Sequence, residues 1–158
     1  MIPKLIVLHH SVSSRDNTTL SDIDAWHRLR WPNFKSSMGY WVGYHWVIVG
    51  NGMAFQTRQN NEIGAHCIPN DGKVGICLTG NFEEEKPSPE QLNSLGVLLE
   101  KLKKDYNLTD KDIKGHRELS QTLCPGRYLM EWLKLYRQLG LIQQLIEKIK
   151  AFLKGRRK

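Results

Sequence analysis

The sequence predicts a single α/β domain with a mixed central β-sheet flanked by helices, followed by a C-terminal amphipathic helix. Two observations predict the domain. Short, continuous apolar runs typical of buried strands recur along the chain, and segments with apolar residues at helical spacing are interspersed with them. A third observation is the change of pattern at Gly140, after which a strongly cationic stretch begins. We therefore expect a domain over residues 1–139 and a tail over residues 140–158.

The first expected strand is Leu5–Leu8, a run of large aliphatic residues that leads directly into His9 and His10. Because successive side chains of a strand point to opposite faces of a sheet, only one of these two histidines can enter a given pocket. A helix is expected from residue 20 to residue 29, with Ser21 as its candidate N-cap.

The middle of the chain is expected to form a hairpin and a second buried strand. Tyr44–Val49 and Met53–Phe55 flank the turn residues Gly50–Gly52. A polar, irregular stretch from residue 57 to residue 71 follows the hairpin. The apolar run Val74–Gly80 then predicts a strand buried on both faces.

The last part of the domain is expected to be mainly helical. Ser88 and Pro89 suit the N-cap and first position of a helix whose leucines recur at helical spacing until about residue 105. A short strand is expected at Ile113–Lys114. The final helix of the domain is predicted from Tyr128 to Leu139, with Gly140 as its stop.

The tail combines an apolar stripe with a concentration of positive charge. Seven apolar side chains fall on one helical stripe: Leu141, Ile142, Leu145, Ile146, Ile149, Phe152 and Leu153. The other side carries six cations against Glu147 alone: Lys148, Lys150, Lys154, Arg156, Arg157 and Lys158. The tail thus supplies +5 of the formal net charge of +7. A cationic amphipathic helix is typical of binding to a membrane surface, so we expect these cations to contact an anionic membrane or cell envelope. Packing of the stripe on the domain is the alternative.

The composition sets limits on partners and compartment. The net charge points to anionic partners such as wall polymers, lipid headgroups or nucleic acid. The odd set of three cysteines (Cys67, Cys77 and Cys124) argues against a disulfide framework and suits a reducing compartment. The apolar run at the N-terminus is too short for a signal peptide, and no run approaches the roughly 20 apolar residues of a membrane span. We therefore expect a cytoplasmic protein.

The stretch Gly115–Gly126 carries the strongest chemical signal. It holds His116 and Cys124 with seven residues between them, and Pro-Gly follows the cysteine. Imidazole nitrogen and thiolate sulfur are ligands that zinc favours. One of the two N-terminal histidines would complete a three-ligand site with an open fourth position, where zinc lowers the pKa of a water molecule toward about 7. Such a site hydrolyses esters or amides, and the hydroxyl groups of Tyr44 and Thr122 are candidates to assist.

Four sequence blocks in order resemble the type-2 N-acetylmuramoyl-L-alanine amidases, the group that includes phage amidase endolysins and catalytic peptidoglycan recognition proteins. The resemblance covers about residues 4–137. The blocks are Ile6–Ser11 (IVLHHS), Val42–Ile48 (VGYHWVI), Val74–Phe82 (VGICLTGNF), and Gly115–Arg117 (GHR) with Cys124–Gly126 (CPG).

The resemblance implies a zinc site with defined residue roles. His9, rather than His10, matches the first zinc ligand of the family, and His116 and Cys124 match the other two. Tyr44 matches the tyrosine that acts beside the metal. Thr122 stands where some phage members carry a lysine and the recognition-protein branch carries threonine.

Two further residues are candidate substrate contacts. His66 lies in the loop that lines the substrate groove of the family. Arg117 is a candidate contact for an acidic stem peptide, with a structural ion pair as the alternative. The implied reaction is zinc-dependent hydrolysis of the amide bond between N-acetylmuramic acid and L-alanine of peptidoglycan. A phage endolysin of this kind would wait in the host cytoplasm and then act on the cell wall, and we expect it to be a monomer.

Two other readings of the sequence stay open. A non-catalytic peptidoglycan-binding module would use the same groove, but modules of that kind typically lack the cysteine ligand, and Cys124 is present. A cationic membrane-active or nucleic-acid-binding protein would account for the net charge. No base-reading motif accompanies that charge, so nucleic acid is not an expected partner.

Overall fold

The computed structural model describes residues 1–155, apart from the side chains of residue 147 and residues 151–155. The predicted membrane contacts Arg156, Arg157 and Lys158 lie outside the described residues, as does the side chain of Lys154. Among the helices of the described part, none is long and apolar enough to cross a bilayer.

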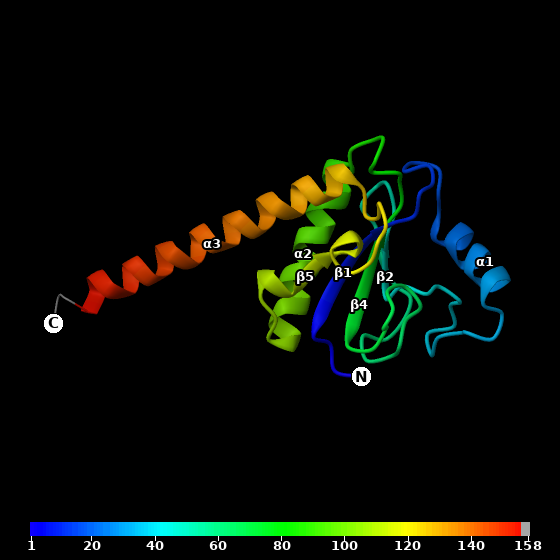
Figure 1. Ribbon diagram of the computed structural model, residues 1–158, viewed down its shortest axis with the longest axis horizontal. Helices are drawn as coiled ribbons and strands as arrows, with labels where there is room; N and C mark the ends of the chain where they lie inside the picture. Colours follow the sequence, from blue (N-terminus) through cyan, green and yellow to red (C-terminus); the bar gives the residue numbers. More distant parts are fainter. Residues whose placement is uncertain (156–158) are drawn as a thin grey trace.

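The core of the fold is a five-stranded sheet with the order β3-β2-β4-β1-β5 (Figure 1). Its strands are β1 (Leu5–His10), β2 (Trp46–Ile48), β3 (Ala54–Gln56), β4 (Lys73–Leu78) and β5 (Ile113–Gly115). β1, β2, β4 and β5 are parallel, and β3 pairs antiparallel with β2 as the second strand of the expected hairpin. The predicted mixed sheet is therefore confirmed.

Helices cover both faces of this sheet. The three α-helices are α1 (Leu20–Arg30), α2 (Pro89–Tyr106) and α3 (Arg127–Gly155), and two short 3₁₀ helices are η1 (Asp110–Asp112) and η2 (His116–Glu118). On one face, leucines of α2 and of the first turns of α3 pack against aliphatic side chains of β1, β4 and β5. On the other face, Ile23 of α1 packs with Val47 of β2 and with Val42 and Val49 beside it.

The helix caps agree with the sequence at α2 and differ at α1. Ser88 caps α2, with its hydroxyl accepting the N–H of Gln91, and Pro89 is the first helical residue. At α1 the cap is Thr19, and the predicted cap Ser21 is wrong. Thr19 and Asp22 bond reciprocally, each side chain accepting the backbone N–H of the other, which satisfies two N–H groups at the helix start.

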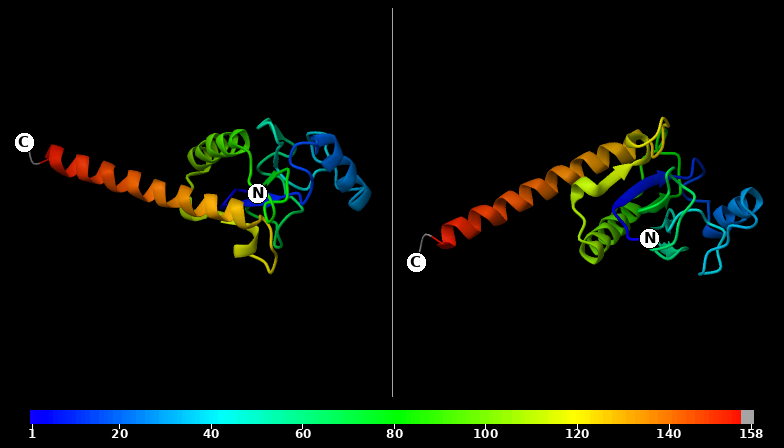
Figure 2. Two further views of the ribbon diagram at one scale, coloured as in Figure 1. Left: turned by 90° about the horizontal axis from the view of Figure 1, so that it is seen from above. Right: turned by 60° about the horizontal axis from the view of Figure 1, so that its bottom comes forward.

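The predicted end of the last helix at Gly140 is also wrong, because α3 continues without interruption to Gly155. Gly140 marks a close contact instead. A Cβ atom at this position would lie 1.9 Å from Oδ2 of Asp110 in η1, so a larger residue there would have to displace this carboxylate. Domain and tail therefore share one helix, whose C-terminal half projects away from the sheet (Figures 1 and 2).

Candidate functional site

The sheet topology brings three chemically reactive side chains to one edge. β1 and β5 are parallel neighbours, so their C-terminal ends lie together. His9 belongs to the end of β1, and His116 directly follows β5. The centroids of their rings are 4.5 Å apart. Cys124, on the loop between η2 and α3, places its Sγ 3.6 Å from Nδ1 of His9.

The donor set and its spacing fit zinc. One ligand atom from each of His9, His116 and Cys124 lies within 4.8 Å of the other two, the spacing of a group that could hold a metal ion. Tetrahedral zinc with ordinary bond lengths separates a nitrogen ligand from a sulfur ligand by about 3.6 Å. The distance between Nδ1 of His9 and Sγ of Cys124 equals that separation. Three protein ligands leave a fourth position for water or substrate.

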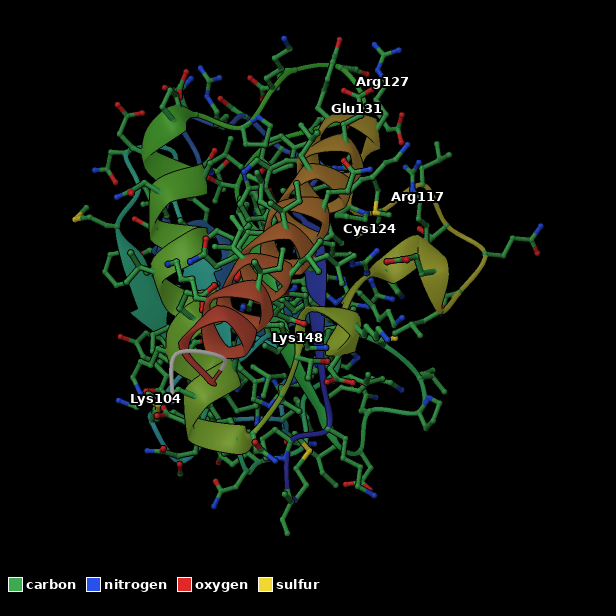
Figure 3. The ribbon with its side chains drawn as sticks, turned by 90° about the vertical axis from the view of Figure 1, so that its left-hand side faces the viewer. Lys104, Arg117, Cys124, Arg127, Glu131 and Lys148 are labelled. Atoms are coloured by element: carbon green, nitrogen blue, oxygen red, sulfur yellow. The ribbon has the colours of Figure 1, made fainter. Side chains whose placement is uncertain are left out.

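Backbone contacts hold the loop around Cys124 in place. The N–H of Arg117 donates to the carbonyl of Cys124 at 2.7 Å, and the N–H of Cys124 donates to Oγ1 of Thr122 at 3.2 Å. Gly126 has a φ of +92°, and a Cβ atom there would lie 2.3 Å from the carbonyl carbon of Phe82. The glycine of the Cys-Pro-Gly motif is thus required by its backbone conformation and by close packing. Figure 3 labels Arg117 and Cys124 in this region beside the start of α3.

His9 and His10 point to opposite faces of the sheet. His9 lies in the cluster with His116 and Cys124. His10 lies on the α2 and α3 side, where its Nδ1 accepts the N–H of Phe82 at 3.1 Å. Burial lowers the pKa of His10 to about 4, so it is a neutral, structural imidazole.

Tyr44 lies just before β2 and faces the cluster. The centroid of its ring is 5.1 Å from that of His9. Burial raises the pKa of Tyr44 well above its ordinary value, and the neighbouring thiols of Cys77 and Cys124 raise it further. The phenol therefore keeps its proton at neutral pH and is available as a hydrogen-bond donor.

The electrostatics of the cluster keep its groups neutral when no cation is bound. Burial lowers the pKa of His9, and the nearby His66 and His116 lower it further. Burial also raises the pKa of the Cys124 thiol to about 12. Neutral imidazoles are ready ligands, whereas the thiol must lose its proton when it binds a metal.

A cavity of about 630 Å³ opens onto the cluster. Besides the three clustered residues, Tyr44, His66 and Thr122 line it. Nδ1 of His66 lies 3.0 Å from Nε2 of His9, so this loop histidine touches the cluster directly. The structure thus brings together the predicted metal-binding residues, both hydroxyl candidates and one of the two predicted substrate contacts.

Arg117 lies outside this lining. Its guanidinium forms an ion pair with Glu83 and also donates to the carbonyl of Leu123. The structural ion pair, which the sequence left as an alternative, is present and braces the loop that carries Cys124.

One wall of the cavity comes from residues outside the predicted zinc site. His27, Arg30 and Trp31, at the C-terminal end of α1, line it. Nδ1 of His27 accepts the N–H of Gly43 at 2.9 Å, which ties α1 to the segment before β2. The spacing of His27, Arg30 and Trp31 on one side of the helix was a usable signal, because residues three and four apart share a helix face.

The chain is similar to proteins of a known family. The sequence profile of the Amidase_2 family, described as N-acetylmuramoyl-L-alanine amidase, matches residues 1–127. Peptidoglycan-recognition protein SD of Drosophila melanogaster is 35% identical over 133 residues, which are 81% of this chain and 69% of that protein.

The chain is also similar to solved structures of amidases and endolysins. The N-acetylmuramoyl-L-alanine amidase LysC from Clostridium intestinale URNW has a TM-score of 0.72 and 35% sequence identity, covering 85% of this chain and 84% of its own. The Ph2119 endolysin from the Thermus scotoductus MAT2119 bacteriophage shares the fold, with a TM-score of 0.71, 23% identity, and coverage of 87% of this chain and 86% of its own. On the extent of the profile match and the similarity to these proteins, the chain belongs to the N-acetylmuramoyl-L-alanine amidase family, Amidase_2.

Proposed function

We propose that the protein is a zinc-dependent N-acetylmuramoyl-L-alanine amidase that acts as a phage endolysin. It would cleave the amide bond between the lactyl group of N-acetylmuramic acid and L-alanine of the stem peptide. In that setting the protein stays in the host cytoplasm until lysis and then acts on the cell wall. The observation that carries the proposal is the grouping of His9, His116 and Cys124 at zinc-compatible distances in a family of amidases. The similarity to endolysin amidases supports the phage setting.

His9, His116 and Cys124 would hold the zinc ion, which when bound polarises a carbonyl and lowers the pKa of a water molecule toward about 7. The protein supplies orientation and hydrogen bonds around this centre. Tyr44, protonated and facing His9, donates a hydrogen bond to the amide oxygen as negative charge develops on it. Donors aimed at a developing oxyanion contribute roughly 10²–10³ in rate.

Thr122 has a second hydroxyl suited to this task. Its oxygen already accepts the N–H of Cys124, which leaves its own O–H to be directed into the cavity. The described residues that line the cavity include no Asp or Glu. The hydroxyl groups of Tyr44 and Thr122 would therefore assist the proton transfers that amide cleavage requires.

The test is digestion of purified peptidoglycan by the wild-type protein, with mass spectrometry of the products. Free N-terminal L-alanine on released stem peptides is the expected result, and it should disappear after zinc is removed and return when zinc is added. Binding to the wall without any such cleavage, with or without zinc, would contradict the proposal and identify a non-catalytic binding module.

We also propose that α3 beyond Gly140 binds an anionic membrane or envelope surface. The apolar residues of this segment whose side chains are described have exposed fractions of 40–59%: Leu141, Ile142, Leu145, Ile146 and Ile149. Lys148 and Lys150, both exposed, lie about 100° to either side of Ile149 around the helix. Cations at the borders of an apolar stripe suit a helix lying in a lipid interface, where the ammonium groups reach the headgroups. Lys148 is labelled on the projecting helix in Figure 3.

The tail is tested by removing residues 141–158 and measuring two activities. The shortened protein should still digest purified wall and should lose binding to vesicles that contain anionic phosphatidylglycerol. Loss of wall digestion together with the tail would show instead that the tail belongs to the catalytic domain.

We propose that the protein acts as a monomer, since one chain supplies the whole cluster. Sedimentation at working concentration tests this, and a dimer that disappears on removal of the tail would assign the stripe to self-association.

A further inference from the structure

We propose that His66 is a positioning residue that acts through His9. Its imidazole sets which nitrogen of His9 carries the proton and aims the other nitrogen at His116 and Cys124. The inference rests on the proposed metal-binding role of His9. It differs from the substrate contact that the family resemblance implies for this residue.

A directed chain of hydrogen bonds leads from the backbone into the cluster. Nε2 of His66 lies 3.4 Å from the carbonyl oxygen of Lys73, and Nδ1 of His66 lies 3.0 Å from Nε2 of His9. A carbonyl can only accept, so Nε2 of His66 carries a proton and its Nδ1 is an acceptor in the neutral ring. His9 must then donate from Nε2. Its Nδ1 is left with a lone pair, on the atom that lies 3.6 Å from Sγ of Cys124.

The ring of His66 occupies a slot bounded by two glycines. A Cβ atom on Gly75 of β4 would lie 2.7 Å from three atoms of the His66 ring. A Cβ atom on Gly64 would lie 2.7 Å from Cδ2 of the same ring. Neither position can carry a side chain unless the imidazole moves. The two glycines therefore allow the ring to stand edge-on to His9, at an interplanar angle of 83°.

Hydrogen bonds also hold the backbone around His66. Oδ1 of Asn70 accepts the N–H groups of His66 and Cys67, both at 2.9 Å. The ammonium group of Lys73 donates to the carbonyl of Pro69. The loop from residue 66 to residue 73 is thus closed on itself, and it presents the imidazole from a fixed position.

Both ring nitrogens of His66 already have hydrogen-bond partners within the protein. This favours a positioning role over direct contact with substrate. A histidine that binds substrate through its ring would offer a nitrogen to the cavity. In metal sites, a hydrogen bond to the far nitrogen of a ligand histidine fixes its tautomer and ring orientation, and loss of such a partner typically costs 10- to 100-fold in metal affinity.

The experiment compares His66→Ala with His66→Asn, since the Asn carboxamide oxygen can accept a hydrogen bond near the position of Nδ1. Zinc affinity is measured by competition with a chelator. We expect roughly 10- to 100-fold weaker zinc binding in His66→Ala and recovery of most of that loss in His66→Asn. His27→Ala is the matched control: His27 is another cavity histidine, its ring bonds to Gly43 rather than to His9, and its removal should leave zinc affinity within about threefold.

A second readout needs no metal. In metal-free protein with ¹⁵N-labelled histidine, long-range ¹H–¹⁵N spectra should show His9 as a single Nε2–H tautomer in the wild type and as a mixture in His66→Ala. Unchanged zinc affinity and an unchanged tautomer in His66→Ala would overturn the proposal, as would a His66→Asn variant no better than His66→Ala. Unchanged zinc affinity with a raised KM for wall fragments would assign His66 to substrate binding. If the wild type binds no zinc, the proposed function fails, and the tautomer spectra still decide the role of His66.

Discussion

Sγ of Cys124 lies 3.6 Å from Nδ1 of His9, although 115 positions of sequence separate the two residues. The sheet makes this possible, because β1 delivers His9 at the edge where β5 turns into the loop that carries Cys124.

Replacing Cys124 with alanine should lower zinc affinity by more than about 100-fold, because a primary ligand contributes more than a residue that only supports one. Zinc content after dialysis and digestion of purified wall should fall together. Circular dichroism should remain that of the wild type, since the loop is also held by Arg117. A Cys124→Ala variant that keeps both zinc and activity would remove this residue from the site.

Tyr44→Phe should lower kcat for wall hydrolysis by about 10²–10³ while zinc content stays unchanged. The substitution removes a hydroxyl whose raised pKa keeps it protonated, and it retains the ring that packs beside His9. Rates on a soluble muramyl peptide and zinc content measured on the same sample check this. A large loss of zinc would mean that Tyr44 shapes the metal site and does not act on the substrate.

Gly140→Ala should destabilise the protein by about 1–3 kcal/mol, because its Cβ would meet the Asp110 carboxylate at 1.9 Å. That carboxylate forms an ion pair with Lys103 at 2.6 Å, so displacing it weakens this contact. Gly96→Ala in α2 is the matched control, since a Cβ atom there has no neighbour within 4 Å. It should stabilise by about 0.5–1 kcal/mol through helix propensity. Urea unfolding gives the change in the free energy of unfolding for both variants. Equal changes at the two sites would refute the prediction.

Stability should fall as the pH drops from about 6.5 toward 4. Burial lowers the pKa of His45 to about 4, and its ring accepts the N–H of Gly75 at 3.0 Å while Nε2 lies 3.0 Å from the carbonyl of Glu62. In the unfolded chain His45 binds a proton near pH 6.5, whereas in the folded chain it binds one only near pH 4. The contribution of His45 to the free energy of unfolding is therefore complete above pH 6.5. It is lost between pH 6.5 and 4, at up to about 1.4 kcal/mol per pH unit.

His45→Gln provides the comparison for this pH dependence. Other buried histidines titrate in the same window, so the variant should still lose stability on acidification, with a shallower slope than the wild type. The free energy of unfolding is measured by urea at pH 7, 6, 5 and 4. Identical slopes for the two proteins would show that His45 does not contribute.

The sequence predicted the mixed sheet, and a zinc site made of His116, Cys124 and one of His9 and His10, for a physical reason; the family resemblance then selected His9. Buried strands have continuous apolar runs, and zinc ligands come from very few residue types. The hydrogen bond between His66 and His9 could not be predicted in this way. It depends on the path of an irregular loop, which no periodic pattern encodes.

Gly140 shows a second limit of sequence reading. A glycine that ends a helix and a glycine that makes room for Asp110 look the same in a sequence, and only the structure shows which one is present. The capping error at α1 has a similar origin. Thr19 and Ser21 both offer a hydroxyl near the helix start, and the reciprocal bonds with Asp22 decide between them.

The uninterrupted course of α3 fixes the rotational phase between the domain that holds the sheet and the apolar stripe. One residue inserted after Gly140 would turn the stripe by about 100° and advance it by about 1.5 Å, whereas seven inserted residues would return it to within about 20° of its original direction. If the stripe rests on a surface as proposed, the length of this helix, counted in residues, sets which side of the domain faces that surface. Natural insertions and deletions here should be tolerated in whole turns far more readily than singly.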